Sequence, residues 1–453
     1  MDAHSDTQAA FFPDLLEKPL LAVFDSELTT SDGGAILLHA KDQQLGVIGR
    51  VAAAIEDRRA PARAKFSVEE ILRQRVLGMG CGYSDANDAA SLRTDPVMKM
   101  CSSRSPASGD SLASQPTVSR FENSITLEDA SRMQAAFMDS VLEACRRRYG
   151  KRVRRVIIDL DPTDDPTYGS QQLSLFNGFY GNHCYLPMMG FVSFDDHPEQ
   201  HIVAAVLRPG NAPGTQSALD ILNSILVRIT RLFPRARVLV RLDGAFSTPE
   251  ILDWLDGANR IDYVVSMAKN PVLERLAEPK MLIARALSEV SGDSQRVYGS
   301  TTYAAKSWGR HRRVVLKAEV TRYRGRDPRD NPRFVVTNLK NDPELVYRLY
   351  CGRGDCENRI KEMKLDLNSG RTSCTRFEAN QLRLTMAAVA FMLIQELRAD
   401  LHGTGCERAS VATIRCRLLK IGARIAETSR RFVMHMPSAF PWIRAFQLIA
   451  GVT

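Results

Sequence analysis

Four side chains that can take part in phosphate chemistry recur at helical spacing near residue 350. They are Tyr350, Arg353, Glu357 and Lys364. An α-helix turns about 100° per residue, so these spacings bring the four side chains within an arc of about 60°. Charged helix faces are usually solvated, and Gly352 weakens the first turn. The pattern therefore becomes informative only together with acids elsewhere in the chain.

Two more acids end predicted strands. Residues 153–161 are β-rich and end in Asp161, and the continuous apolar segment 237–243 ends in Asp243. Neighbouring strands would place these carboxylates side by side, with Glu357 reaching them from a helix across the sheet face. Carboxylate oxygens suit hard cations such as Mg²⁺. Two such ions about 4 Å apart can activate an attacking oxygen and stabilise the leaving 3′ oxygen of a phosphodiester. The three acids therefore predict nuclease or strand-transfer chemistry.

The first of these acids has a neighbour that spacing cannot exclude. Asp159 and Asp161 alternate along the same strand, so both side chains lie on one face and either could be the ligand. Asp164 and Asp165 follow in a polar segment and are predicted to be loop acids. A lone histidine in a loop is more often structural than catalytic, and we expect this of His183.

The elements that must position these acids follow in a recognisable order. Three strands are predicted first, then a helix, a strand, a second helix and a fifth strand. The strands are residues 153–161, 187–194, 201–207, 237–243 and 261–267, and the helices are 218–234 and 249–255. This order, with acids ending the first and fourth strands, is the layout of the ribonuclease H-like fold. We therefore expect an α/β protein whose ribonuclease H-like catalytic core has a mixed five-stranded sheet.

The remaining sequence divides into regions around this core. Residues 1–150 are predicted to form a helical DNA-binding region, with capping boxes that begin at Ser67 and Thr126. Within it, residues 114–123 resemble a recognition helix, although capped polar helices are more often plain surface helices. The core is predicted in two parts, separated by a basic, β-rich insertion and followed by a helical C-terminal region. These segments are residues 151–270, 271–340, 341–400 and 401–453.

The composition indicates a globular protein that favours polyanions. The 453 residues are 44% hydrophobic and 25% charged, and 61 basic against 52 acidic residues give a net charge of +9. These values exclude a disordered or fibrous chain and favour nucleic acid as the partner. The basic run 146–155 could grip a duplex backbone, or could be a solvated helix end.

Membrane, secretory and disulfide signals are weak in this sequence. The longest apolar run, 386–394, is shorter than the roughly 20 residues of a membrane helix. The segment Met1–Asp6 is acidic where a secretory signal would be basic and then apolar. The 9 cysteines are scattered, without a Cys-x-x-Cys pair, which predicts reduced thiols. We expect a cytoplasmic protein associated with DNA.

The chain resembles DDE-type insertion-sequence transposases, in the transposase DDE domain group 1 whose signature is Tyr-x₂-Arg-x₃-Glu-x₆-Lys. Residues 350–364 match this signature without a gap. The resemblance extends from about residue 153 to 398 and includes the surroundings Asp161-Pro-Thr163 and Leu242-Asp-Gly244. It favours Asp161 over Asp159, because the family has Thr or Ser two residues after its metal-binding Asp.

The resemblance implies a role for each charged residue of the site. Asp161, Asp243 and Glu357 would bind two Mg²⁺ ions, for which Mn²⁺ can substitute. Arg353 and Lys364 would bind DNA by holding phosphates near the cut.

Two aromatic side chains are also implied to contact DNA. Tyr350 would brace the terminal phosphate. Trp308, among the basic strands of the insertion, would stack on a base extruded during hairpin formation, as the insertion does in some relatives. Tryptophan is, however, more often part of a core.

The implied function is that of a DNA transposase. Such a protein binds the terminal inverted repeats of its element as a homodimer on double-stranded DNA, cuts the ends, and joins the free 3′-OH groups to target DNA. One alternative is a transposase-derived DNA-binding protein without catalytic activity. Another is a glycan hydrolase with paired carboxylates, whose activity would survive a chelator.

Overall fold

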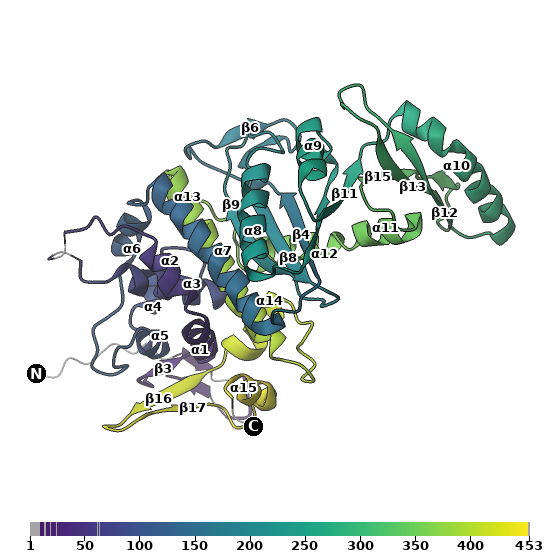
Figure 1. Cartoon of the computed structure of the whole chain (residues 1–453). Coiled ribbons are helices and arrows are strands. Elements are labelled where there is room, and N and C mark those ends of the chain that lie inside the picture. Colours follow the sequence, from purple (N-terminus) through teal and green to yellow (C-terminus); the bar gives the residue numbers. More distant parts are fainter. Residues whose placement is uncertain are drawn as a thin grey trace, which may run out of the picture.

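In the residues that the computed structural model describes (10–12, 15–18, 20–23, 25–60, 62 and 64–451), a nine-stranded mixed sheet forms the centre of an α/β molecule (Figure 1). Its strands follow the order β9-β8-β4-β10-β11-β15-β13-β12, and β14 pairs with β13. The strands are β4 (Arg155–Pro162), β8 (Met188–Phe194), β9 (His201–Val206), β10 (Arg237–Leu242), β11 (Ile261–Met267), β12 (Gln295–Tyr303), β13 (Arg312–Thr321), β14 (Arg329–Asp330) and β15 (Arg333–Thr337).

The strands expected from the sequence lie next to one another in this sheet. β4, β10 and β11 are parallel, whereas β8 is antiparallel to β4 and β9 is antiparallel to β8. The expected helices are α8 (Ala218–Leu232) and α9 (Pro249–Gly257). Because β4 and β10 are parallel neighbours, their carboxyl ends meet at the same edge of the sheet.

The predicted limit of five strands is wrong, because the sheet continues beyond β11. β15 pairs with β11 in antiparallel register, from Val264 opposite Thr337 to Met267 opposite Phe334. The buried Phe334–Val336 segment and the otherwise unpaired hydrogen-bonding groups of β11 favour this pairing. The predicted insertion is therefore an extension of the central sheet.

The same insertion contains a long helix that the β-rich prediction missed. α10 (Pro271–Ser291) begins at Asn270, whose side chain accepts hydrogen bonds from the N–H groups of Val272 and Leu273. Its buried stripe repeats every three or four residues and packs on β12 and β13. Figure 1 shows this helix and these strands together at one end of the molecule, farthest from the N-terminal helices.

Two apolar layers cover the central sheet. On one face, Val346 and Tyr347 of α11 (Pro343–Cys351) pack on Ile157, Leu239 and Val264. On the other face, the residues alternating with these join the main core with α8 and α9. Successive side chains of a strand point to opposite faces, so Asp159 and Asp161 share the face of Ile157. α12 (Gly354–Asp366) follows α11 and contacts β4.

The N-terminal region is helical apart from short strands. The helices are α1 (Ala35–Leu45), α2 (Val47–Ala53), α3 (Val68–Gly80), α4 (Asp88–Leu92), α5 (Pro96–Cys101), α6 (Gln115–Glu122) and α7 (Leu127–Tyr149). The strands are β1 (Ala10–Phe12), β2 (Leu20–Ala22) and β3 (Thr29–Thr30). Both predicted capping boxes, at Ser67 and Thr126, are present. The segment Met1–Asp6 lies outside the described residues.

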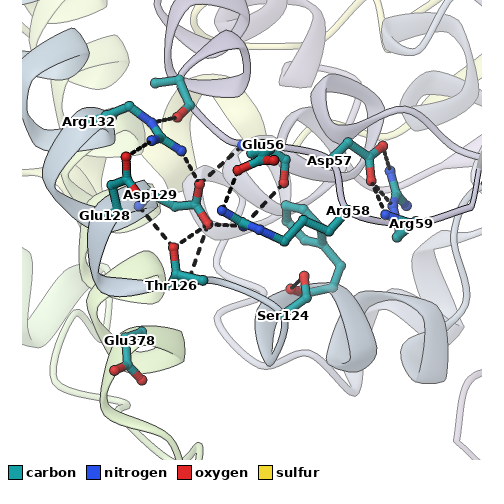
Figure 2. A network of polar contacts seen from close by, with 12 residues as sticks. Glu56, Asp57, Arg58, Arg59, Ser124, Thr126, Glu128, Asp129, Arg132 and Glu378 are labelled. Atoms are coloured by element: carbon teal, nitrogen blue, oxygen red, sulfur yellow. Dashed lines mark hydrogen bonds and ion pairs between the residues drawn. The ribbon is translucent and has the colours of Figure 1, made fainter.

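One buried carboxylate fastens the segment after α2 to the start of α7 (Figure 2). Asp129 accepts hydrogen bonds from the side chain of Arg58 at 2.6 Å and from that of Arg132 at 2.5 Å. It also accepts from the backbone N–H groups of Glu56 and Thr126, both at 3.1 Å. A carboxylate with this many donors remains charged and fixes the loop that carries Arg59.

α13 (Phe377–Ala399) connects the N-terminal helices to the sheet. It contacts α1, α3 and α7 as well as β9, and its Met386–Ile394 run is buried throughout. The longest apolar run of the sequence is therefore part of a helix buried in the core. Among the described residues, no helix is long and apolar enough to cross a membrane.

The C-terminal region is mixed, and the prediction of helices alone is wrong. α14 (Val411–Ile414), the π-helical turn η3 (Arg415–Leu419) and α15 (Ile443–Ile449) accompany a hairpin of β16 (Ala423–Glu427) and β17 (Phe432–His435). β16 also pairs with β3. Ala423 and Ile425 are buried whereas Arg424 between them is exposed, which is the period of a strand.

The chain between β4 and β8 forms a small three-stranded sheet of its own. It consists of β5 (Asp165–Pro166), β6 (Leu175–Asn177) and β7 (Asn182–Tyr185), in the order β5-β7-β6. Asp165 therefore lies in a short strand and is buried, in contrast to the loop expected for it. All cysteines from Cys81 to Cys416 are free thiols, as the sequence predicts.

Candidate active site

Three carboxylates converge on the guanidinium group of Arg353. Its Nη2 lies 2.7 Å from Oδ1 of Asp161 and 3.9 Å from Oδ2 of Asp243. Its Nη1 lies 2.8 Å from Oε1 of Glu357. The acids proposed from the sequence thus meet around one cation, although 82 and 114 residues separate them along the chain.

Each carboxylate comes from a different element. Asp161 is near the carboxyl end of β4, and Asp243 directly follows β10. Asp243 also caps the short helix η2 (Gly244–Phe246) by accepting a 2.9 Å hydrogen bond from the N–H group of Ala245. Glu357 is in the first turn of α12, one turn after Arg353. The parallel pairing of β4 and β10 and the crossing of α12 therefore form the site.

The site carries an excess of negative charge. Burial, opposed by Arg353 and assisted by Asp243 and Glu357, raises the pKa of Asp161 to about 7. Burial also raises the pKa of Asp243, and Glu357 adds to that effect against Arg353. One guanidinium does not neutralise three ionised carboxylates, so a further positive charge would be stabilised at this site.

The donor set fits a hard divalent cation. Carboxylate oxygens are the ligands that Mg²⁺ and Mn²⁺ use in proteins, with water and phosphate oxygens completing the coordination. Within the described part of the chain, no three candidate ligands are arranged as a closed metal site. The carboxylates of Asp161, Asp243 and Glu357 instead surround the positively charged guanidinium group of Arg353.

Asp159 forms its ion pair with Arg241 and not with Arg353. Its Oδ1 accepts a 2.8 Å hydrogen bond from Nε of Arg241, and its Oδ2 accepts one of 2.6 Å from Nη2. Gln200 donates to the same Oδ2 at 3.2 Å. Asp159 is 1% exposed. This placement favours Asp161 as the carboxylate that is open to the site.

Arg241 links the central sheet to the helix junction that carries Arg353. Its Nη1 donates to the carbonyl oxygen of Leu349 at 3.0 Å, near the end of α11. A Cβ atom on Gly352 would lie 2.4 Å from that same nitrogen. Glycine at this position therefore permits the close approach. Arg241 supports the candidate site through these contacts and was missed by the sequence prediction, although a charged residue inside an otherwise apolar strand was a signal that could have found it.

The predicted single helix is interrupted at the junction. α11 ends at Cys351 and α12 begins at Gly354, so Tyr350 belongs to a different helix from Glu357 and Lys364. The glycines on either side of Arg353 account for the break. Tyr350 packs beside Tyr347, with 6.1 Å between ring centroids.

Lys364 lies at the rim, at the other end of the charged face of α12. Its Nζ donates to the backbone oxygen and to Oδ1 of Asp164, both at 2.8 Å, and to Oγ1 of Thr163 at 3.3 Å. It therefore ties α12 to the segment after β4. Lys364 forms its ion pair with Asp164, and the structure shows no ion pair from it to Asp161, Asp243 or Glu357.

Trp308 is packed against its own sheet. It is 9% exposed, and the guanidinium carbon of Arg312 lies 5.0 Å from the ring centroid. Tyr303 meets the same ring edge-on at 5.6 Å. This arrangement favours a packing role over base stacking, because Arg312 already lies over the ring and little of the side chain is exposed.

Basic side chains line two cavities away from the carboxylates. One cavity of about 540 Å³ lies where β4 and β10 begin, at the sheet edge opposite to Asp161 and Asp243, and within the described residues no acidic side chain lines it. Its cations are Arg146, Lys151, Arg152, Arg231 and Arg235.

The second basic cavity, of about 790 Å³, lies at the start of α6. Its cations are Arg59, Lys65, Arg93 and Arg120. Arg59 is held by Asp57 through hydrogen bonds of 2.7 Å (Figure 2). This cavity includes part of the segment that resembles a recognition helix, so the N-terminal region presents positive charge at that point.

Comparison with known proteins identifies a family. The family model described as transposase DDE domain group 1 matches residues 12–452 of the chain. No curated protein matches the chain.

Proposed function

Since the chain belongs to the transposase DDE domain group 1 family, we propose that it binds the terminal inverted repeats of an insertion sequence and catalyses metal-dependent cleavage and strand transfer of the DNA. The family is one of DDE-type transposases of mobile elements. The observation that carries the proposal is the convergence of Asp161, Asp243 and Glu357 on Arg353.

The strand arrangement supports a ribonuclease H-like core. The central strands have the order β9-β8-β4-β10-β11, with antiparallel pairing on one side of β4 and parallel pairing on the other. Asp161 lies near the end of the first strand of this unit along the chain, and Asp243 directly follows the fourth. This is the arrangement that the sequence predicts for such a core.

The carboxylates of Asp161, Asp243 and Glu357 would hold two Mg²⁺ ions. When bound, such ions supply activation of the attacking oxygen and stabilisation of the leaving 3′ oxygen. The raised pKa of Asp161 follows from burial and from its acidic neighbours, and added positive charge would favour its ionised form.

The cations of the site would hold the DNA backbone. Arg353 is 6% exposed, and its Nε is buried without a hydrogen-bond partner among the described residues. A guanidinium can bind phosphate through two parallel hydrogen bonds. Both Nη atoms of Arg353 are bonded to Asp161 and Glu357, so Arg353 would have to exchange these carboxylates for the phosphate in order to position a phosphodiester beside them. Lys364 and Tyr350 would hold phosphates on either side of it.

The basic cavities support DNA binding outside the site. Lys and Arg side chains that contact phosphates supply most of the sequence-independent affinity for DNA. The cavity at α6 supports assignment of the N-terminal region to DNA binding. Transposition must bring two DNA ends together, so we propose a homodimer on DNA.

Cleavage of the DNA that flanks the gene tests this proposal. A duplex carrying the flanking inverted repeat should be bound, and should be cut at the repeat end in Mg²⁺ or Mn²⁺ but not in EDTA. Asp243→Asn should retain binding and lose cleavage. Binding without cleavage by the unaltered protein in either metal would support the non-catalytic alternative. Cleavage that survives the chelator would contradict the two-metal mechanism.

A further inference from the structure

α10 carries a second apolar stripe, on the side that faces away from the sheet. Its buried stripe packs on β12 and β13. The outer stripe consists of five side chains that are between 40% and 90% exposed: Val272, Leu276, Ile283, Leu287 and Val290. At 100° per residue, these side chains fall within an arc of about 60°. A continuous apolar stripe on a helix that is already packed indicates an interaction surface.

One edge of the outer stripe carries charge in a self-complementary order. Arg275, Leu282 and Glu289 follow one another at intervals of seven residues, so they lie along one side of the helix. All three are exposed. Among the described residues, neither Arg275 nor Glu289 forms an ion pair, whereas Arg285 of the same helix is paired with Glu278. The two charges are therefore available to a partner.

A second copy of α10, running antiparallel to the first, satisfies both charges. When Leu282 lies opposite Leu282 of the other copy, Arg275 of each copy lies opposite Glu289 of the other, because both residues are seven positions from Leu282. A two-fold interface uses the same surface on both subunits in this way. The same register brings the two outer stripes together, as in an antiparallel coiled coil.

The charge of α10 argues against DNA as the occupant of this stripe. The helix carries three basic residues, Arg275, Lys280 and Arg285, and three acidic residues, Glu274, Glu278 and Glu289. A surface that contacts phosphates is instead dominated by Lys and Arg. Lys280 extends along β12, where its Cε would lie 3.2 Å from a Cβ atom on Gly299. Its side chain is thus directed to the sheet.

The size of the stripe fits a weak dimer. A helix of 21 residues is about 31 Å long. One face of such a helix is smaller than the roughly 800 Å² per partner of a standard stable interface. We therefore expect free chains to pair only at high protein concentration.

We propose that the outer stripe of α10 is the surface through which two copies of this chain pair, antiparallel about Leu282. The stripe supplies the apolar contact, and the two pairs between Arg275 and Glu289 fix the register. The extensions of the two central sheets are then joined helix to helix. This inference rests on the proposed homodimer, for which it names the contact.

Charge reversal in the full-length protein tests the register. Sedimentation equilibrium measures the dissociation constant of the dimer, at about 50 mM salt so that exposed ion pairs are little screened. Arg275→Glu and Glu289→Arg should each weaken pairing by about tenfold, because two attractive pairs become two repulsive ones. The protein with both changes should pair as the unaltered protein does. The two positions are about 21 Å apart within one helix, so only a second copy explains such a rescue.

The apolar contact has its own variants. Leu276→Ser combined with Ile283→Ser should weaken pairing by at least about tenfold. Val227 of α8 is 70% exposed and gives the matched control, so Val227→Ser should pair normally. All of these side chains are exposed, so the temperature of thermal unfolding should not change. An unchanged unfolding temperature shows that any loss of pairing is not a loss of fold.

A cross-link tests the antiparallel orientation. A short bismaleimide should join two copies of Leu282→Cys, because the two-fold axis brings this position against itself. It should not join two copies of Val272→Cys, because ten residues from the axis the two thiols are about 30 Å apart. The exposed Cys351 and Cys416 are present in every variant, so the unaltered protein gives the background.

Three results would each overturn the α10 interface. They are normal pairing by the charge-reversed proteins, no rescue by the double reversal, and equal cross-linking of Val272→Cys and Leu282→Cys. An unaltered protein that never pairs, with no cross-link in Leu282→Cys, overturns it as well. All these measurements use protein without DNA. A chain that pairs through α10 but neither binds nor cuts the repeat duplex overturns the proposed function and leaves the interface standing.

Discussion

Asp159 of β4 and Arg241 of β10 are neighbours in the parallel register, and their side chains form an ion pair through two hydrogen bonds of 2.6 and 2.8 Å. They are 1% and 5% exposed. Arg241 also contacts the end of α11, so the pair joins the sheet to the helix junction that carries Arg353. Asp159 thus helps to position the helix junction that carries Arg353, and we do not expect its carboxylate to bind the metal ions.

Removing Asp159 should destabilise the fold far more than removing Asp161. Asp159→Ala leaves the Arg241 charge buried and unpaired, which should lower the free energy of unfolding by about 3–5 kcal/mol. Asp161→Ala removes a carboxylate whose pKa burial raises, so stability should stay within about 1 kcal/mol or rise slightly. Urea unfolding in metal-free buffer at pH 8 measures both. Equal losses would contradict these separate roles.

The two glycines that flank Arg353 should respond differently to alanine. Gly352→Ala places a Cβ atom 2.4 Å from Nη1 of Arg241, so the arginine must move and lose its bond to Leu349. We expect about 1–3 kcal/mol of destabilisation and a lower rate of DNA cleavage. No atom lies within 4 Å of a Cβ on Gly354, and alanine is the better helix former there by up to about 1 kcal/mol. Thermal unfolding of the two variants measures the difference: Gly352→Ala should unfold at a lower temperature than the unaltered protein, whereas Gly354→Ala should not.

The core of the fold could be predicted because its signals are local. Apolar runs ended by Asp161 and by Asp243 predicted the strands and two candidate acids, and the spacing of Glu357 gave the third candidate; the three lie around Arg353 in the structure. These features depend on neighbours along the chain. The amphipathic stripe of α10 is equally local, but Pro279 lies inside that helix, and a proline within a helical pattern usually indicates that the helix ends there.

The parts that were missed depend on distant partners. Arg241 acquires its role from the β4–β10 register, which pairs it with Asp159. β16 is a short strand whose partner β3 lies near the other end of the chain. Such pairings follow from the packing of the whole chain, so residue types within one window do not reveal them. The cavity lined by Asp165 and Thr372 likewise joins loops that are about 200 residues apart.

Arg353 should weaken metal binding by the free protein. Arg353→Ala removes the only guanidinium shown among the three carboxylates in the described residues. One unit charge at about 4 Å is worth several kcal/mol at an effective dielectric constant of about 20, so Mn²⁺ should bind at least about tenfold more tightly. DNA cleavage should nevertheless fall, because the phosphate contact is lost. Electron paramagnetic resonance of free Mn²⁺ measures the affinity.

Arg348→Ala gives the matched control for that experiment. Arg348 is an exposed cation on α11, near the end of the helix. It should change neither Mn²⁺ affinity nor cleavage appreciably. Unchanged Mn²⁺ affinity in Arg353→Ala would mean that the carboxylates do not share a cation.

Asp165 should make stability depend on pH. Burial, opposed by Thr372 and Lys364 and assisted by Asp164, raises its pKa to about 7. The folded protein therefore holds this proton more tightly than the unfolded chain, whose value is near 3.8. The stabilising contribution is complete below about pH 4 and is lost as the pH rises to about 7.

Replacing this acid isolates its contribution. The stability of the unaltered protein relative to Asp165→Asn should fall by a few kcal/mol between pH 4 and pH 8. Urea unfolding at several pH values measures this difference. Both proteins contain Asp161, so its titration contributes nearly equally to each and largely cancels in the comparison. A difference that does not change with pH would show that Asp165 titrates normally.

The basic cavity at the far edge of the sheet should contribute to DNA affinity without contributing to chemistry. Lys151, Arg152 and Arg235 are exposed there, and the length of β4, roughly 25 Å for eight residues, separates them from Asp161. Each phosphate contact adds about 0.9 to the slope of log affinity against log salt concentration. Changing all three residues to Ala should therefore lower that slope by about 2 to 3, whereas Arg285→Ala should not, because Glu278 and Asp330 already neutralise Arg285. Under saturating DNA the triple variant should cleave at the normal rate, since the carboxylates at the opposite edge are unchanged. If the triple variant instead had a normal salt slope and cleaved slowly, these residues would act in the chemical step. That result would contradict the assignment of DNA affinity to this edge and of cleavage to the opposite edge.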